Sequence, residues 1–380
     1  MPAGASGEAD ATAAAGTAGA AAPLAGQGES TAAESLGGQG GSTAAEPFGG
    51  EGGSTAAGPL GGRSGRTVAE PFVDRVGFGA AELAAVGDRL GAPIVAVRPL
   101  TGGYRNRNVA ARTASGHRYV LRRYLDPAAC AVESALAVRL ADSAVPVPRP
   151  VFADPAGALL GDPLLVSAFA AGTPGDRVIG YGTAQDAAGI GAAMGETLAA
   201  IGSVRFTAPG FLGPDLTVTG GPVATGLAEF VAGQLPDSNA AAAFTPAELD
   251  ALRALAERSA PLVETVRAEA RLVHCDYNPK NVLAVRDGGG WRIGAVLDWE
   301  FALSGSPMFD LGNALRFAAD RPAGYADRFV AAFRDAGGLL PADWRAVAEA
   351  VDLFALVQFL SRPTDHRYFA KSVALLRRRL

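Results

Sequence analysis

Cysteine and lysine are both scarce in this 380-residue chain. Its two cysteines, Cys130 and Cys275, are too few for a disulfide framework and lack metal-site spacing, which favours a reducing compartment. Lysine occurs only at positions 280 and 371. The net charge of −5 argues against a general nucleic-acid binder. No apolar run is long enough to span a bilayer, and no signal-peptide pattern opens the chain. We therefore expect a soluble, cytoplasmic protein that binds neither nucleic acid nor membrane.

Residues 1–66 consist almost entirely of Gly, Ala, Ser, Thr, Pro and Glu, and they contain a repeat with a period of 12. STAAESLGGQGG begins at Ser30, STAAEPFGGEGG at Ser42 and STAAGPLGGRSG at Ser54. A short Gly-rich repeat cannot bury enough apolar surface to offset its chain entropy. We predict a disordered tail, which is either a tether or dispensable, and its composition favours the second interpretation.

The remainder has the patterns of an α+β protein with two lobes. Apolar spacing and turn signals separate a β-rich first part, residues 67–169, from a mainly helical second part, residues 170–380. Strands are predicted at 94–100, 106–112, 117–125 and 164–169, with an extended connector at 145–151. Helices are predicted at 80–90, 127–141, 184–201, 246–268, 310–318, 324–336 and 341–360.

A β-rich island interrupts the helical part and carries a constellation of oxygen-bearing side chains. It reads LVHCDYNPKNVLAVRDGGGWRIGAVLDWE from Leu272, with short strands at 282–285 and 293–297 joined by a DGGG turn. Asp276 and Asn281 lie on the loop before the first strand, and the hairpin returns Asp298 close to Asn281. Phosphoryl transfer needs a carboxylate for the acceptor hydroxyl and oxygen ligands for Mg²⁺. Asp276 suits the first role, and Asn281 and Asp298 suit the second.

The segments HCDYNPKN and VLDWE resemble the aminoglycoside phosphotransferase family, a branch of the protein-kinase-like fold. The resemblance implies that Asp276 is the catalytic base and that Asn281 and Asp298 are magnesium ligands. It also implies that His274 is a buried organiser of the loop and that Asp310, in MFDLGNALRF, braces the loop by hydrogen bonds. The family usually has glycine where this chain has cysteine, between the His and the Asp.

The β-rich lobe should hold the nucleotide. LTGGYRNRNV places Gly102 and Gly103 between two strands, where the backbone can approach a phosphate. This lobe has no lysine, and by resemblance Arg122 of YVLRRY takes the usual lysine position. Glu133 shares a helix face with apolar residues, which predicts an ion pair with Arg122, unless Glu133 lies in water at the edge of that face.

The segment between the lobes, LLVSAFAAG, is identified by position and resemblance as the hinge. Adenine is expected to bond there to backbone groups near Ser167, Ala168 and Phe169. The acceptor is expected beside Asp276, with residues 202–245 forming part of its wall. Asp320 and Asp365 are candidate acids for a cationic acceptor, but the helical lobe is only mildly acidic overall, which does not decide the substrate.

The sequence thus predicts an enzyme that uses ATP and Mg²⁺ to phosphorylate a hydroxyl of a small molecule. The acceptor class stays open among aminoglycoside-like antibiotics, sugars, amino alcohols and related metabolites, because one fold serves many functions. The alternative is a non-catalytic, pseudokinase-type module that binds a nucleotide or metabolite. A protein kinase is less favoured, because no separate activation segment is visible between Asp298 and Asp310. The oligomeric state stays open.

Overall fold

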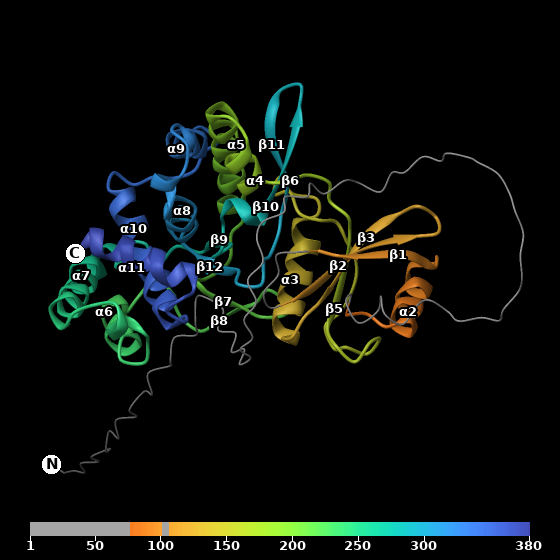
Figure 1. The fold of residues 1–380 in the computed structure, drawn as a ribbon, viewed down its shortest axis with the longest axis horizontal. Coiled ribbons are helices and arrows are strands. Elements are labelled where there is room, and N and C mark those ends of the chain that lie inside the picture. Colours follow the sequence, from red (N-terminus) through yellow and green to blue (C-terminus); the bar gives the residue numbers. More distant parts are fainter. Residues whose placement is uncertain (1–76, 101–105) are drawn as a thin grey trace, which may run out of the picture.

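The computed structural model describes residues 77–100 and 106–380 (Figure 1). The predicted α+β architecture with two lobes is confirmed: a β-sheet with two helices occupies one side of the molecule, and a mainly helical region occupies the other. The repeat tail predicted for residues 1–66 lies outside the described residues. So do Gly102 and Gly103 of the predicted phosphate loop.

The smaller lobe is one antiparallel sheet with strand order β1-β2-β3-β5-β4. Alternation along the strands directs Val109, Leu121 and Val166 into a buried cluster with Phe78 and Val86. The predicted elements form within one or two residues of their expected bounds. They are α2 (Ala80–Leu90), β1 (Ile94–Pro99), β2 (Arg107–Thr113), β3 (Arg118–Arg123), α3 (Pro127–Leu140) and β5 (Leu164–Ala168).

Helix α3 joins the two lobes through its apolar side chains. It begins at Pro127, where the Asp126 side chain accepts a hydrogen bond from the N–H of Ala128 at 2.9 Å. Val132, Leu136 and Leu140 belong to the large buried core of the helical lobe, although the helix follows β3 in the chain. The packing of these apolar side chains fixes the orientation of α3, and with it the position of Glu133 on the same helix.

One expectation in this lobe is corrected. The extended connector predicted at 145–151 ends in a further strand, β4 (Pro150–Asp154), which pairs antiparallel with β5 at the edge of the sheet. Proline tolerates this position because the first residue of an edge strand need not donate to the ladder.

The helical lobe surrounds one large core. Its predicted helices form, together with the shorter helices α4 and α6 and the C-terminal helix α11, which were not predicted. They are α4 (Gly175–Tyr181), α5 (Ala184–Ser203), α6 (Leu227–Gln234), α7 (Pro246–Glu264), α8 (Met308–Leu315), α9 (Tyr325–Asp335), α10 (Trp344–Gln358) and α11 (Arg367–Arg379). None of the helices in the described part of the chain is long and apolar enough to cross a membrane.

The helical lobe also contains short strands, which lead into the loops of the site. β10 pairs with β11 as the predicted hairpin, with Val282 opposite Val296, and also with β6. A second sheet has the order β8-β7-β12-β9. Their bounds are β6 (Thr173–Pro174), β7 (Gly210–Leu212), β8 (Val218–Thr219), β9 (Arg271–Val273), β10 (Val282–Asp287), β11 (Gly290–Val296) and β12 (Leu303–Gly305).

Close packing of α5 against α9 depends on two glycines one turn apart. A methyl group added at Gly191 would collide with the carbonyl oxygen of Tyr325, and one added at Gly195 would collide with that of Phe329. We expect Gly195→Ala to lower the free energy of unfolding by roughly 3 kcal/mol, because the helices must separate. Gly233→Ala, in α6 with open space around it, should be neutral or slightly stabilising. Urea unfolding compares the two variants, and equal stability would contradict this account of the packing.

Candidate functional site

Asp276 lies on the loop between β9 and β10, and two amides hold its carboxylate. The side-chain N–H groups of Asn278 and Asn281 each donate to one of its oxygens at 2.8 Å. Burial raises the pKa of Asp276, and the negative charge of Asp298 adds to this shift. Both oxygens keep lone pairs that can accept a further proton donor. Asn278 was not among the predicted site residues, although its position two residues after the aspartate is that of a local side-chain cap.

Asn281 and Asp298 are brought together by the hairpin, as predicted. The N–H of Leu297 donates to the carbonyl of Asn281 at 2.8 Å, so Asp298 follows directly beside it. Asp298 has a φ of 73°, a left-handed conformation that non-glycine residues adopt rarely and that clusters at functional sites. The loop before β10 and the turn after β11 therefore converge on one point.

The side-chain oxygens of Asn281 and Asp298 are suitable ligands for a hard divalent cation. The amide nitrogen of Asn281 is committed to Asp276, so its amide oxygen is left as an acceptor, and Asp298 adds a carboxylate. Within the described residues, no group of three His, Cys, Asp or Glu side chains is placed to hold a metal. Magnesium typically binds through one or two protein oxygens completed by phosphate oxygens and water.

Arg122 of β3 links the smaller lobe to this pair. Its guanidinium lies 3.5 Å from Glu133 of α3 and also bonds to Asp298. The predicted ion pair between Arg122 and Glu133 therefore forms, and Glu133 is buried rather than in water. Burial alone would lower the pKa of Arg122, but the nearby negative charges, chiefly Glu133, raise it overall. Burial raises the pKa of Glu133, and Arg122 opposes that shift.

A second contact between the lobes was not anticipated. The side-chain amide of Asn106, just before β2, donates to Glu300 at 2.9 Å, and Glu300 also lies 4.0 Å from Arg122. No local pattern could find this bond, because 194 residues separate its two ends.

His274 and Asp310 hold the loop from beneath, in the arrangement that the resemblance implied. Asp310 accepts the N–H groups of His274 and Cys275 at 2.8 and 2.9 Å. The fully buried imidazole of His274 lies 2.9 Å from the carbonyl of Leu297 and accepts the N–H of Asp276 at 3.2 Å. Since a carbonyl only accepts, Nε2 carries the proton and Nδ1 does not. Burial lowers the pKa of His274 to about 4, which keeps the ring neutral.

Cys275 stands where the family that the sequence resembles usually has glycine, and the backbone shows why glycine suits this position. Its φ is 64°, in the left-handed region that glycine enters freely and other residues at a cost. The bond from its N–H to Asp310 helps to hold that conformation. Burial raises the pKa of the Cys275 thiol well above its usual range, which argues against a nucleophile.

The predicted hinge lies at the end of β5. The N–H of Ala168 donates to the carbonyl of Arg149 at 2.8 Å, and that of Phe169 donates to Arg118 at 3.0 Å. Ser167 lies opposite Val120 in the ladder. An adenine bound at this stretch would therefore use carbonyl groups or the residues that follow, rather than the N–H groups of Ala168 and Phe169.

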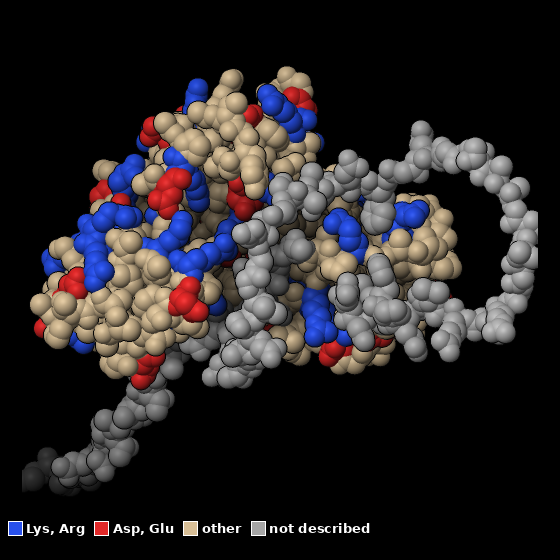
Figure 2. Space-filling model, in the orientation of Figure 1, with Lys and Arg blue, Asp and Glu red and all other residues tan. Residues whose placement is uncertain are grey.

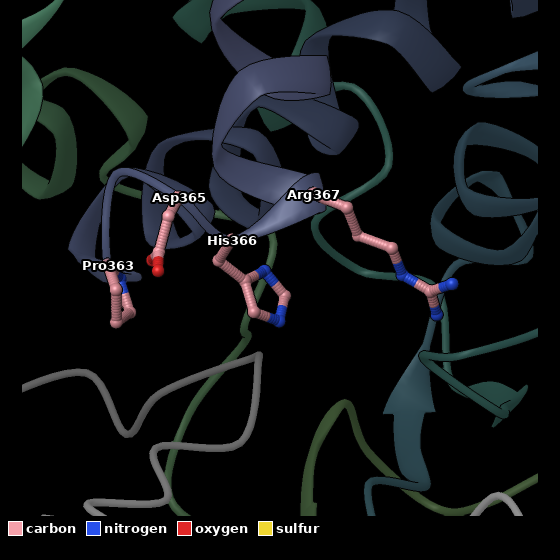
Figure 3. Close-up of a pocket in the computed structure, with 4 residues that line it drawn as sticks. All are labelled: Pro363, Asp365, His366 and Arg367. Carbon is pink, nitrogen blue, oxygen red and sulfur yellow. The ribbon is translucent and has the colours of Figure 1, made fainter. Parts of the chain in front are cut away.

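The two acids proposed for a cationic acceptor differ in their surroundings. Asp320 is engaged by Lys371 at 2.9 Å. Asp365 lies at a hollow near the start of α11 together with Pro363, His366 and Arg367 (Figure 3). Among the described residues, neither Asp320 nor Asp365 contacts Asp276, so neither places a free carboxylate beside it.

The role of Arg122 can be tested against its neighbour Arg123. Strand alternation places Arg123 on the other face of β3, where it pairs with Glu82 at 2.6 Å and Asp162 at 3.3 Å. We expect Arg122→Met to weaken Mg-ATP binding roughly tenfold, because a charge-assisted bond is lost. Stability should fall by roughly 3 kcal/mol, because Glu133 stays buried without its partner.

Calorimetric titration with AMP-PNP and urea unfolding measure these two effects. Arg123→Met should alter stability but leave nucleotide affinity within about twofold, since it faces away from the site. Equal nucleotide affinities for the two variants would refute the phosphate-binding role of Arg122.

Comparisons with known proteins identify the family of the chain. A sequence model of the phosphotransferase enzyme family matches residues 96–350, more than half of the chain, so the chain belongs to that family. It is a small-molecule phosphotransferase of protein-kinase-like fold. No match was found among curated proteins.

Solved structures show the same fold at low sequence identity. A thermostable mutant of aminoglycoside phosphotransferase APH(4)-Ia, in complex with AMP-PNP and hygromycin B, aligns with a TM-score of 0.55 at 19% identity, over 79% of this chain and 98% of its own. Macrolide 2'-phosphotransferase MphH from Brachybacterium faecium aligns with a TM-score of 0.52 at 20% identity, over 77% and 97%. A GDP complex of an aminoglycoside 2'-phosphotransferase-IIIa mutant aligns with a TM-score of 0.57 at 14% identity, over 78% and 94%.

Proposed function

We propose that the protein transfers the γ-phosphoryl group of ATP, with Mg²⁺, to a hydroxyl group of a small molecule. The observation that carries this proposal is the convergence of Asp276, Asn281 and Asp298, with Arg122 reaching them from the other lobe. The relatives in complex with AMP-PNP or GDP support the use of a nucleotide. The nucleotide would lie between residues 67–169 and residues 170–380.

Each side chain has a role that follows from its contacts. Asp276, held by two amide donors, orients the acceptor hydroxyl and accepts its proton as the oxygen attacks phosphorus. Arg122 is the cation that contacts the phosphates. Asp298, which bonds to Arg122 in this structure, would bind the metal instead when nucleotide binds. Asn281 and Asp298 would hold Mg²⁺, which supplies charge compensation for the phosphates.

The supporting residues keep this geometry without touching substrate. His274 fixes the backbone of Asp276 and the carbonyl that precedes Asp298, and Asp310 fixes the backbone of His274 and Cys275. Such positioning matters because phosphoryl transfer depends on alignment and charge more than on covalent help from the protein.

The experiment that tests the function is an acceptor screen. ATP consumption is measured with and without Mg²⁺ against aminoglycosides, macrolides, sugars and amino alcohols, and phosphorylated products are identified by mass spectrometry. Phosphorylation of a hydroxyl compound that requires both Mg²⁺ and Asp276 supports the proposal. Nucleotide binding without any transfer would favour the pseudokinase-type binding module instead.

A further inference from the structure

Basic and aromatic side chains gather beside the catalytic loop, where α11 begins. The ring of Tyr368 stacks with Phe359 and Phe317 at centroid distances of 5.3 and 6.5 Å. Lys280, the residue before Asn281, bonds to the Tyr368 hydroxyl and lies 4.7 Å from the ring centroid. Arg367 lies 4.8 Å from the same centroid. We call Lys280, Phe317, Phe359, Arg367 and Tyr368 the basic-aromatic cluster.

The two cations of this cluster differ from two other basic residues that contact its rings. Lys371 is neutralised by Asp320 at 2.9 Å, and Arg316 by the buried Asp352 at 2.7 Å. In the part of the chain that the structure describes, no carboxylate oxygen lies within 4.0 Å of the side-chain nitrogens of Lys280 or Arg367. Both side chains are exposed. They are therefore available to an anion from solution.

The hydroxyl of Tyr368 adds a third donor. It accepts from Lys280 and, at 3.5 Å, from Arg367, so its own proton remains to be donated. No acceptor for that proton occurs among the described residues. Lys280 and Arg367 each donate one N–H group to the Tyr368 hydroxyl, and their remaining N–H groups and the Tyr368 O–H can still donate. Such a set of donors matches the oxygens of a carboxylate, sulfate or phosphate.

Lys280 connects the cluster to the loop that carries Asp276. Lys280 and Asn281 belong to the same 3-10 turn (Pro279–Asn281), and Asn281 bonds to Asp276. In Figure 3 the Arg367 side chain extends away from Asp365, which lies on the opposite side of His366. Figure 2 shows Lys and Arg side chains on this face of the helical lobe, with acidic side chains among them.

The pKa of His366 also reflects the positive charges around it. Burial lowers its pKa, and the charges of Arg362 and Arg367 lower it further, against a smaller opposing effect of Asp365. A polycationic aminoglycoside would place ammonium groups against Lys280 and Arg367, with repulsion as the result. An anionic group would be attracted to the same place.

We propose that the basic-aromatic cluster binds an anionic group of the acceptor, so that the substrate is an anionic hydroxyl compound rather than a polycation. This inference rests on the proposed function, because it assigns the acceptor of the same site. The anion and the reacting hydroxyl belong to one molecule, the first held by Lys280, Arg367 and Tyr368 and the second facing Asp276.

The first experiment measures anion binding without turnover. Inorganic phosphate is titrated onto the full-length protein with Mg²⁺ and AMP-PNP present, and its binding is followed by the ³¹P line width. We expect the double variant Lys280→Ala, Arg367→Ala to bind phosphate at least tenfold more weakly than the parent. Arg328→Ala, an exposed arginine of α9, is the matched control and should bind as the parent does. Absence of binding in the parent, or equal binding in the double variant, overturns the proposal.

The second experiment separates an acceptor-borne anion from free phosphate. Three hydroxyl compounds with the same ring but different charge, D-glucuronate, D-glucose and D-glucosamine, are compared by kcat/KM. We expect the parent to favour glucuronate over glucosamine at least tenfold and the double variant to lose that preference. Preference for glucosamine overturns the inference while leaving the phosphotransferase function intact. Phosphate binding at the cluster without transfer to any anionic acceptor would assign the cluster to free phosphate and would also overturn it.

Discussion

Replacing Asp276 with alanine is expected to lower kcat by about 10³-fold, the usual scale for removing a general base. Two amide donors at 2.8 Å hold the Asp276 carboxylate in place, and its free lone pairs can accept the proton of a hydroxyl. Nucleotide affinity should stay within a fewfold of the parent, because Arg122, Asn281 and Asp298 are unchanged. Steady-state kinetics with the acceptor found by screening, together with AMP-PNP titration, measures both quantities.

The fold should survive this substitution. Asp276 is only partly buried, and its loss leaves two amide donors that water can reach, so the melting temperature should change by only a few degrees. Asp335→Ala, an exposed acid of α9, serves as the control and should keep full activity. If the Asp276 variant were as active as the parent, Asp276 would not be the base.

Replacing Asp310 with alanine is expected to damage both stability and activity. Asp310 is fully buried and accepts the N–H groups of His274 and Cys275, which would be left without acceptors in the interior. Each unsatisfied buried N–H costs about 1–3 kcal/mol, so we expect a loss of roughly 2–6 kcal/mol in the free energy of unfolding. kcat should fall as well, because Cys275 loses the bond that helps to hold its left-handed backbone.

Asp310→Asn is the conservative comparison, because it keeps the size of the side chain and one acceptor oxygen. It should recover part of the stability lost in the alanine variant, as measured by urea unfolding. Full stability in the alanine variant would show that the two N–H groups find other partners and that Asp310 is not a brace.

The stability of the parent and of Asp310→Asn can also be compared as a function of pH. Burial raises the pKa of Asp310 to about 7, from an ordinary value of 3.8. Between these two values the folded state keeps a proton that the unfolded state has released, so stability falls as pH rises through this window. This group alone would account for a loss of roughly 3–4 kcal/mol between pH 4 and pH 7. Asp310→Asn lacks the titration, so its stability deficit relative to the parent should shrink from pH 5 to pH 8. A constant deficit would contradict the raised pKa.

The order of elements and the chemistry of the loop were readable from the sequence because they are encoded locally. Asp276 and Asn281 are five residues apart on one loop, and the DGGG turn fixes the return of the chain to Asp298. Strand alternation puts Arg122 and Arg123 on opposite faces of β3, and the position of Glu133 on an apolar helix face indicated it as the ion-pair partner. In each case a period or a short spacing determines which side chains meet.

Helix α11 shows where such local signals end. Its 13 residues carry five basic side chains, and a helix of this length is marginal in water by itself. Burial of Phe369, Val373 and Leu376 in the core of the helical lobe stabilises it. That burial depends on α7, α10 and the turn before α11, which pack against it only in the folded protein.

The sequence by itself thus determined the class of protein and predicted Asp276 as the reacting carboxylate, because short spacings and turns place the motif within about 30 residues of chain. Only the tertiary structure decided which groups surround that carboxylate. Arg122 reaches Asp298 across 176 residues, Asn106 reaches Glu300 across 194, and Tyr368 meets Lys280 across 88. These contacts arise from the packing of two lobes and a final helix, and no period in the sequence encodes their distances. The acceptor side of the site, and with it the charge of the substrate that we infer, belongs to this second group.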